Sequence, residues 1–167
     1  MKKLLICLLI ATAFFGLSCQ SGPTSSGAVI EGEVTQEKVN SALEQIYNAY
    51  RTRLDMSGAQ DYTVVRGDSL SAIARSHFGS LSDVGEAGPS NGFYFPVIMM
   101  ASSGSHILDP DLIEPGMRLK IIDLKRNLAD SSSRKAIKDF LNDVAYVYNR
   151  KGRASEEDGL KKLANSL

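Results

Sequence analysis

The stretch that decides the fold is residues 62–79, which read YTVVRGDSLSAIARSHFG. Its first four residues are β-formers and predict a short strand, and Gly67 allows a tight turn after that strand. Asp68 or Ser69 can cap the helix that follows, because apolar residues then recur at helical spacing up to the final glycine. The stretch therefore predicts a strand, a turn and a short helix.

The second half of the pattern begins at residue 95. Residues 95–101 predict another helix, with a proline tolerated in its first turn. Residues 109–116, which read DPDLIEPG, predict a loop that closes with a Pro-Gly turn. Residues 117–122 predict a second strand, with Leu119 and Ile121 on one face. We expect the two strands to pair antiparallel with both helices over one face, which gives an α+β fold.

Taken together, these pieces resemble the LysM module. The matching pieces, in chain order, are Tyr62-Thr63-Val64, Gly67-Asp68-Ser69-Leu70, Ile73-Ala74, Phe78-Gly79, Pro110-Asp111-Leu112-Ile113, Pro115-Gly116 and Leu119-Lys120-Ile121. The resemblance covers residues 61–123. It implies a βααβ fold that binds glycans containing N-acetylglucosamine, mostly peptidoglycan or chitin. The sequence departs from the family's pattern in an insertion over residues 80–94 and in Ser102, which stands where an asparagine is common.

By the same resemblance, a glycan groove lies between two loops. The residues carried over are Gly67, Asp68, Ser69 and Leu70 of the first loop and Pro110, Asp111, Leu112 and Ile113 of the second. Backbone groups of such loops can pair with the N–H and C=O of an N-acetyl group, while apolar side chains shelter its methyl group. Three of these residues have an alternative role. Asp68 can cap the helix instead of binding sugar, which is the commoner role of an aspartate at such a position, and Leu70 and Ile113 can belong to the core instead of the groove floor.

Helical segments flank the module on both sides. Residues 35–58 and the C-terminal region 130–167 carry apolar stripes at helical spacing, with Thr35 and a serine of residues 131–133 as caps. We expect these stripes to pack on each other or on the module. The last stretch, from Ser155, has few apolar residues and contains a glycine, so a short or frayed helix is expected there.

The first 34 residues predict an export signal, a lipid anchor and a tether. Residues 1–18 combine a basic start with an apolar run too short to span a membrane, as in a secretory signal peptide. The sequence before Cys19 resembles a bacterial lipoprotein cleavage box, so Cys19 is expected to carry a lipid such as palmitate. An ordinary signal cleavage nearby is the alternative. Residues 19–34 are rich in Ser, Gly and Pro and predict a flexible tether of about 20 Å. The expected location is the cell envelope, on a bacterial membrane and facing the periplasm.

The composition disfavours several functional classes. Without Lys2 and Lys3 of the signal, the chain has 17 basic and 19 acidic residues, a net charge of −2, which disfavours binding to nucleic acid. One mature cysteine and two isolated histidines suggest neither a metal site nor a catalytic group, and the flanks are too short for a hydrolase. We therefore expect no enzyme, no metal and no cofactor.

The function that the sequence favours is a membrane-anchored lipoprotein that binds peptidoglycan through one LysM module. The alternative is a lipoprotein scaffold whose flanking helices bind a protein partner, with the LysM unit structural. An accessory of a cell-wall hydrolase is less favoured.

Overall fold

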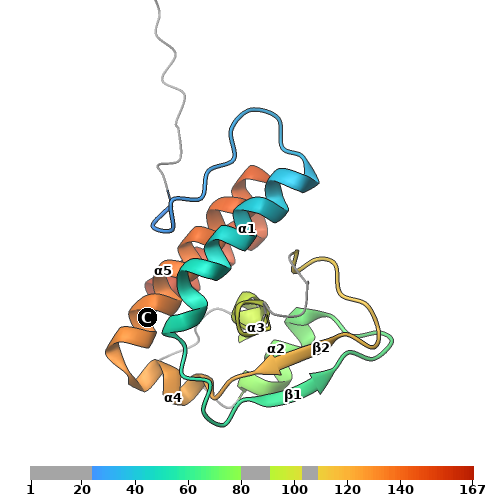
Figure 1. Ribbon diagram of the computed structural model, residues 1–167, viewed down its shortest axis with the longest axis vertical. Helices are drawn as coiled ribbons and strands as arrows, with labels where there is room; N and C mark the ends of the chain where they lie inside the picture. The colour runs from blue at the N-terminus through green and yellow to red at the C-terminus, as the bar shows by residue number, and fades with distance from the viewer. Residues whose placement is uncertain (1–23, 80–90, 103–108) are drawn as a thin grey trace, which may run out of the picture.

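A two-stranded sheet with short helices lies beside a pair of long helices in the computed structural model (Figure 1). The structure describes residues 24–79, 91–102 and 109–167. The predictions for the signal peptide, for Cys19 and for most of the insertion therefore lie outside the described residues, as does His106, one of the two histidines. The α+β class and the order of strand, helix, helix and strand are confirmed.

The sheet consists of β1 (Gln60–Thr63) and β2 (Arg118–Ile121). They pair antiparallel, with Tyr62 opposite Leu119. Leu119 and Ile121 are buried, so the predicted inner face of the second strand is confirmed. β1 begins and ends two residues earlier than predicted, because this register ends the regular pairing at Thr63.

Two helices cover this sheet and join its strands. α2 (Leu70–Phe78) begins after Ser69, whose hydroxyl accepts a hydrogen bond from Ala72 N at 3.3 Å. A short 3-10 turn, η3 (Asn91–Tyr94), leads into α3 (Phe95–Ala101). α3 packs against both β2 and α2. Both helices lie where the apolar spacing predicts them.

Ser102 ends α3 and fastens it to the second strand. Its hydroxyl donates to Ile98 O at 2.6 Å and accepts from Lys120 N at 2.7 Å. The side chain is buried, so both hydrogen bonds are shielded from water. A serine therefore supplies the hydrogen bonds at this helix end, and the departure from asparagine leaves the fold intact.

The long helices are α1 (Gln36–Tyr50) and α5 (Ser131–Arg150), and their apolar stripes pack on each other. The ring of Tyr50 lies edge-on to Phe140, with 5.9 Å between ring centroids. α1 is shorter than predicted, since a 3-10 turn, η1 (Arg51–Arg53), replaces its last part. The stripes thus find their partner within the chain.

The start of the C-terminal region differs from the prediction. A short helix, α4 (Leu124–Ala129), precedes α5 and is not predicted from the sequence. The cap of α5 is Asp130 rather than a serine, because its carboxylate accepts from Ser133 N at 2.7 Å. Asp130 is placed one residue before the serines, which are then the first residues of the helix itself.

The end of the chain forms an ordered helix, so the prediction of a short or frayed one is wrong. α6 (Ala154–Asn165) packs along α5 and buries Leu160 and Leu163. Gly159 faces the ring of Phe93, and a Cβ at this position would overlap that ring. The glycine is therefore a contact point between α6 and η3.

The described part of the predicted tether, residues 24–34, is packed rather than free, which corrects the prediction. The amides of Ser25 and Ser26 donate to the carboxylate of Asp143 in α5 at 2.9 and 2.8 Å. The buried apolar residues of the segment are Ala28 and Ile30. Composition alone suggests a flexible linker, but a buried carboxylate on α5 needs donors, and this segment supplies them.

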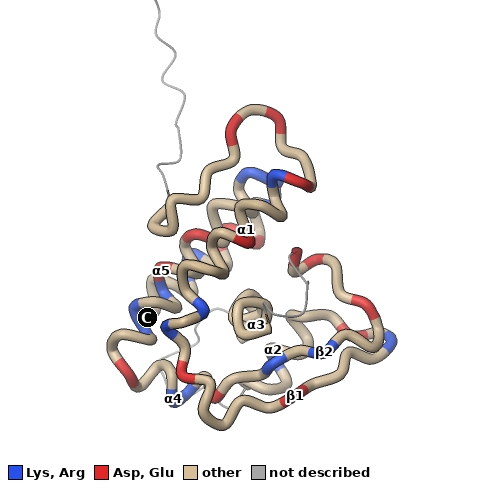
Figure 2. Tube along the Cα trace, viewed as in Figure 1, with Lys and Arg blue, Asp and Glu red and all other residues tan. Residues whose placement is uncertain are grey.

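Charge is distributed unevenly over the surface. Figure 2 shows acidic residues in the loop before α1 and basic residues around the end of α1 and α4. The exposed basic residues at that end are Arg51, Arg53, Lys125 and Arg126. Over the residues that the structure describes, no helix has the length and the apolar character needed to span a membrane.

Candidate functional site

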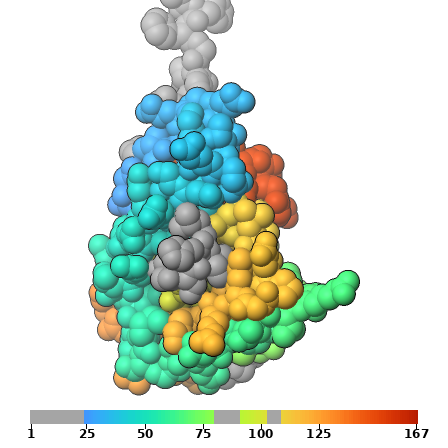
Figure 3. All heavy atoms as spheres, turned by 45° about the vertical axis from the view of Figure 1, so that its right-hand side comes forward, coloured from blue at the N-terminus to red at the C-terminus, as the bar shows by residue number. Residues whose placement is uncertain are grey.

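The two predicted loops border one cleft of about 290 Å³. Its lining residues are Asp68, Ser69, Leu70, Ser71, Phe95, Pro110, Asp111, Ile113, Tyr148, Arg153 and Glu156. Six of the eight residues predicted for the glycan groove are therefore brought together, while Gly67 and Leu112 lie outside this lining. In Figure 3 the loop after β1, in green, projects from the right of the molecule.

A carboxylate fixes the shape of the first loop. Asp68 Oδ2 accepts from Tyr62 Oη at 2.8 Å and from Val65 N at 2.9 Å. Gly67 has a φ of +96°, a conformation that glycine adopts without strain. Asp68 therefore braces the turn, while Ser69 caps α2. A turn held in this way presents its remaining backbone groups in a fixed geometry.

Apolar side chains form the floor of the cleft. Leu70 and Phe95 are buried, and Ile113 is half-buried at the edge. The ring of Phe95 lies edge-on to Tyr148 of α5, with 5.9 Å between ring centroids. By contrast, the side chain of Leu112 is 57% exposed on the outer surface of the second loop. An apolar floor with polar groups at the rim suits a small, neutral ligand.

A third wall comes from the C-terminal helices, which the sequence reasoning did not place at the site. Tyr148 of α5 and Arg153 and Glu156 at the start of α6 line the cleft. Arg153 is ion-paired with Glu156 and, at 3.3 Å between Nη1 and Oδ2, with Asp111. The helical spacing of Tyr148 assigns it to an inner face, but no local signal relates it to a loop about forty residues away.

Ionic contacts hold the second loop. The Asp109 side chain is 2% exposed, and its carboxylate accepts from Lys151 Nζ at 3.0 Å. Burial alone raises the pKa of Asp109, but the Asp111 amide, Gln36 and Lys151 outweigh it and lower that pKa overall. Asp109 is therefore ionised at neutral pH although it is buried.

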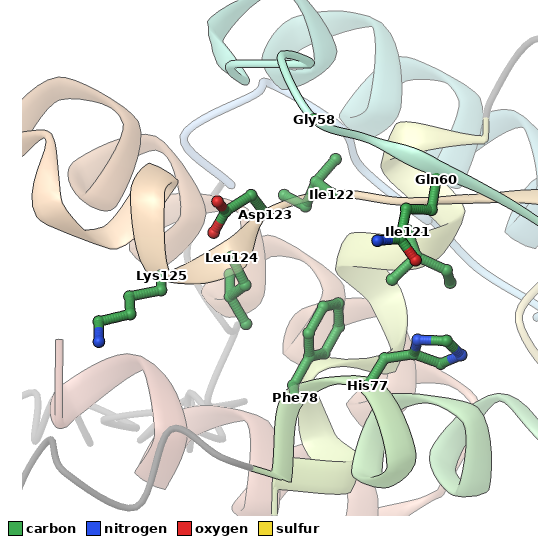
Figure 4. A pocket seen from close by; sticks show the side chains of 9 residues that line it. All are labelled: Gly58, Gln60, His77, Phe78, Ile121, Ile122, Asp123, Leu124 and Lys125. Atoms are coloured by element: carbon green, nitrogen blue, oxygen red, sulfur yellow. The ribbon is translucent and has the colours of Figure 1, made fainter.

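A second hollow of about 320 Å³ lies at the other end of the sheet (Figure 4). Phe78 and His77 of α2 face it from one side, and residues 121–125 border it from the other. Asp123 there caps α4 by accepting from Arg126 N at 3.0 Å. None of the predicted site residues lines it. Among the residues with a described position, no three His, Cys, Asp or Glu side chains gather as metal ligands.

Comparison with known proteins identifies the first half of the site. Residues 62–87 match the family model described as LysM domain, and the match includes the second half of β1, the first loop and α2. No curated protein and no solved structure matches the chain. A LysM domain implies binding to peptidoglycan or chitin, and thus association with the cell wall. The loop and the helix that build one side of the cleft are therefore part of a LysM domain at residues 62–87.

Proposed function

We propose that this protein is an exported, lipid-anchored component of the bacterial cell envelope that binds peptidoglycan through its LysM cleft, without catalysis and without a cofactor. The main support for the proposal is that two loops far apart in the chain lie side by side. The loop within the matched residues 62–87 meets the loop of residues 110–113 in a single cleft, although about forty residues separate the two loops in the chain.

The chemistry of the cleft supports a neutral sugar ligand. The floor of Leu70 and Phe95 can receive the methyl group of an N-acetyl substituent, and the braced turn offers backbone donors and acceptors. Each such hydrogen bond contributes only about 0.5–1.5 kcal/mol net. A weak ligand is therefore expected, and anchoring beside the wall would compensate by an effective concentration of about 1 mM or more.

The alternative of a scaffold that binds a protein through its flanking helices has less support. That alternative needs apolar helix faces that are free to receive a partner. The apolar residues of α1 and α5, including Tyr50 and Phe140, are instead buried against each other. The cleft between the two loops, by contrast, has room for a ligand.

Co-sedimentation with insoluble peptidoglycan tests the proposal. We expect the purified protein to pellet with peptidoglycan and the variant Ser71→Tyr to lose affinity by about tenfold or more, since Ser71 lines the cleft and a tyrosine would fill it. Ser76→Tyr is the matched control, because Ser76 is exposed on the same helix and does not line the cleft. Equal pelleting of both folded variants would place the binding site elsewhere.

Fractionation of cells tests the anchor separately. We expect the wild-type protein in the membrane fraction and Cys19→Ser in the soluble fraction, because serine offers no thiol for lipid attachment. Labelling with a palmitate analogue should follow the same pattern. A Cys19→Ser protein that still sediments with membranes would contradict the lipid anchor and leave the glycan proposal untouched.

A further inference from the structure

Lys151 lies at the end of α5 and reaches two carboxylates of the second loop. Its Nζ is 3.0 Å from Asp109 Oδ2 and 2.8 Å from Asp111 Oδ2. The Lys151 side chain is only 15% exposed, and its Nζ also lies 5.2 Å from the centre of the Tyr148 ring. Lys151 thus sits between the loop and the helix that forms the third wall of the cleft.

Other groups hold the same loop from several elements. Gln36 Nε2 of α1 donates to Asp109 Oδ2 at 2.7 Å, and the amide of Asp111 donates to Asp109 Oδ1 at 3.0 Å. Tyr148 Oη donates to Asp111 Oδ1 at 3.1 Å. The loop is therefore fixed to α1 and α5, which both lie outside the residues that match the LysM family.

The charges explain why Lys151 matters more than the neutral donors. Asp109 and Asp111 are like charges in neighbouring positions, and the first of them is almost fully buried. A buried carboxylate that loses its cation is strongly destabilised. Without Lys151, the carboxylate of Asp109 would therefore favour an outward movement of the loop that exposes it to water. Such a movement would carry Pro110 and Ile113 away from the cleft that they line.

The ion pair persists across the neutral range of pH. Burial alone would lower the pKa of Lys151, but its hydrogen bonds to Asp111 and Asp109 outweigh burial and raise it overall. The pKa of Asp109 is lowered by the same pair together with its other donors. Both groups therefore stay charged near neutral pH.

We propose that Lys151 is a positioning residue for the glycan cleft: it holds residues 109–113 in the geometry that binding requires, so that the C-terminal helices are part of the binding unit. The proposal rests on the proposed function, because it concerns affinity for a glycan at that cleft. It predicts that the LysM match alone does not define the whole binding site.

The test is a titration of the purified full chain with a soluble N-acetylglucosamine oligomer, at a temperature where every variant is folded. We expect Lys151→Met to lower the affinity about tenfold and Lys151→Arg to restore most of it, since arginine can again pair with both carboxylates. Lys161→Met is the matched control, because Lys161 pairs with Glu157 on the exposed side of α6, outside the cleft. Its affinity should equal that of the wild type.

A second variant separates positioning from stability. In Lys151→Met combined with Asp109→Asn, no buried charge is left unpaired, so the unfolding midpoint should recover while the affinity stays low. This double variant also decides the question if Lys151→Met alone does not fold. Wild-type affinity in either folded variant would overturn the positioning role. If the wild type itself binds neither the oligomer nor peptidoglycan, the proposed function fails instead.

Discussion

Replacing Asp143 by alanine is expected to detach residues 24–30 from α5 and to lower the free energy of unfolding by about 3 kcal/mol. Asp143 is buried and accepts from Ser25 N, from Ser26 N and, at 2.9 Å, from Tyr50 Oη. Burial raises the pKa of Tyr50, and the hydrogen bond to Asp143 raises it further, so this hydroxyl stays protonated as a donor. Removing the acceptor leaves all three donors without their partner and also exposes the side chain of Ile30.

Two measurements check this expectation. Urea denaturation gives the loss of stability, and limited digestion with elastase reports cleavage after Ala28, which is fully buried in the intact protein. Asp139→Ala is the matched control one turn earlier on α5, because the Lys135–Asp139 ion pair is largely exposed on the lysine side and should contribute less than about 0.5 kcal/mol. Unchanged resistance to elastase in folded Asp143→Ala would mean that other contacts hold the segment.

Replacing Gly159 by leucine is expected to destabilise the protein by about 2 kcal/mol, although helix propensity alone favours leucine by about 0.8 kcal/mol. The opposite sign follows from packing, because any side chain at this position overlaps the ring of Phe93. The ring would have to leave α6, and the contact between η3 and this helix would be lost. Urea denaturation followed by circular dichroism measures the change.

A double variant distinguishes this mechanism from a general effect of the substitution. Phe93→Ala removes the ring, so combining it with Gly159→Leu should recover stability relative to Gly159→Leu alone, as the leucine then occupies the vacated space. Lys162→Leu, at an exposed position of α6, should change the stability by less than about 0.5 kcal/mol. Additive losses in the double variant would show that Phe93 and Gly159 do not act on each other.

The parts of the fold that sequence predicts well are those fixed by neighbouring residues. The strand, turn and helix around Gly67 depend on local propensity and on one glycine with positive φ, and the structure contains them. The sequence left open which residue caps α2, and it assigned the cap of α5 to a serine. Ser69 caps α2, since Asp68 is already bonded to Tyr62 and Val65, and Asp130 caps α5, since the serines after it are helical.

The parts that sequence did not predict depend on partners far away in the chain. Ala28 and Ile30 look too sparse to anchor a segment, but Asp143 and Tyr146 on α5 bind its backbone amides and hold it against that helix. In the same way, the few leucines of α6 suffice because α5 offers them a surface.

The candidate site shows the same division. Resemblance to a family identified both loops, and the structure brings them to one cleft. The wall of Tyr148, Arg153 and Glu156 belongs to helices that the family pattern does not include, so neither motif nor periodicity could reveal it. Asp111 was predicted to bind the glycan, but its carboxylate accepts hydrogen bonds from Tyr148 and Lys151. These contacts within the protein occupy both of its oxygens.

The packing of residues 24–34 on α5 changes the expected distance between a bilayer and its wall. With a lipid on Cys19, the chain up to Thr24 can extend by at most about 18 Å, and residues 24–34 after it belong to the folded body. In Figure 1 the β1–β2 module lies at the far end of that body from the loop before α1. The protein would then act as a rigid spacer, because the length of its folded body, rather than a flexible linker, would set the distance between the bilayer and the cell wall.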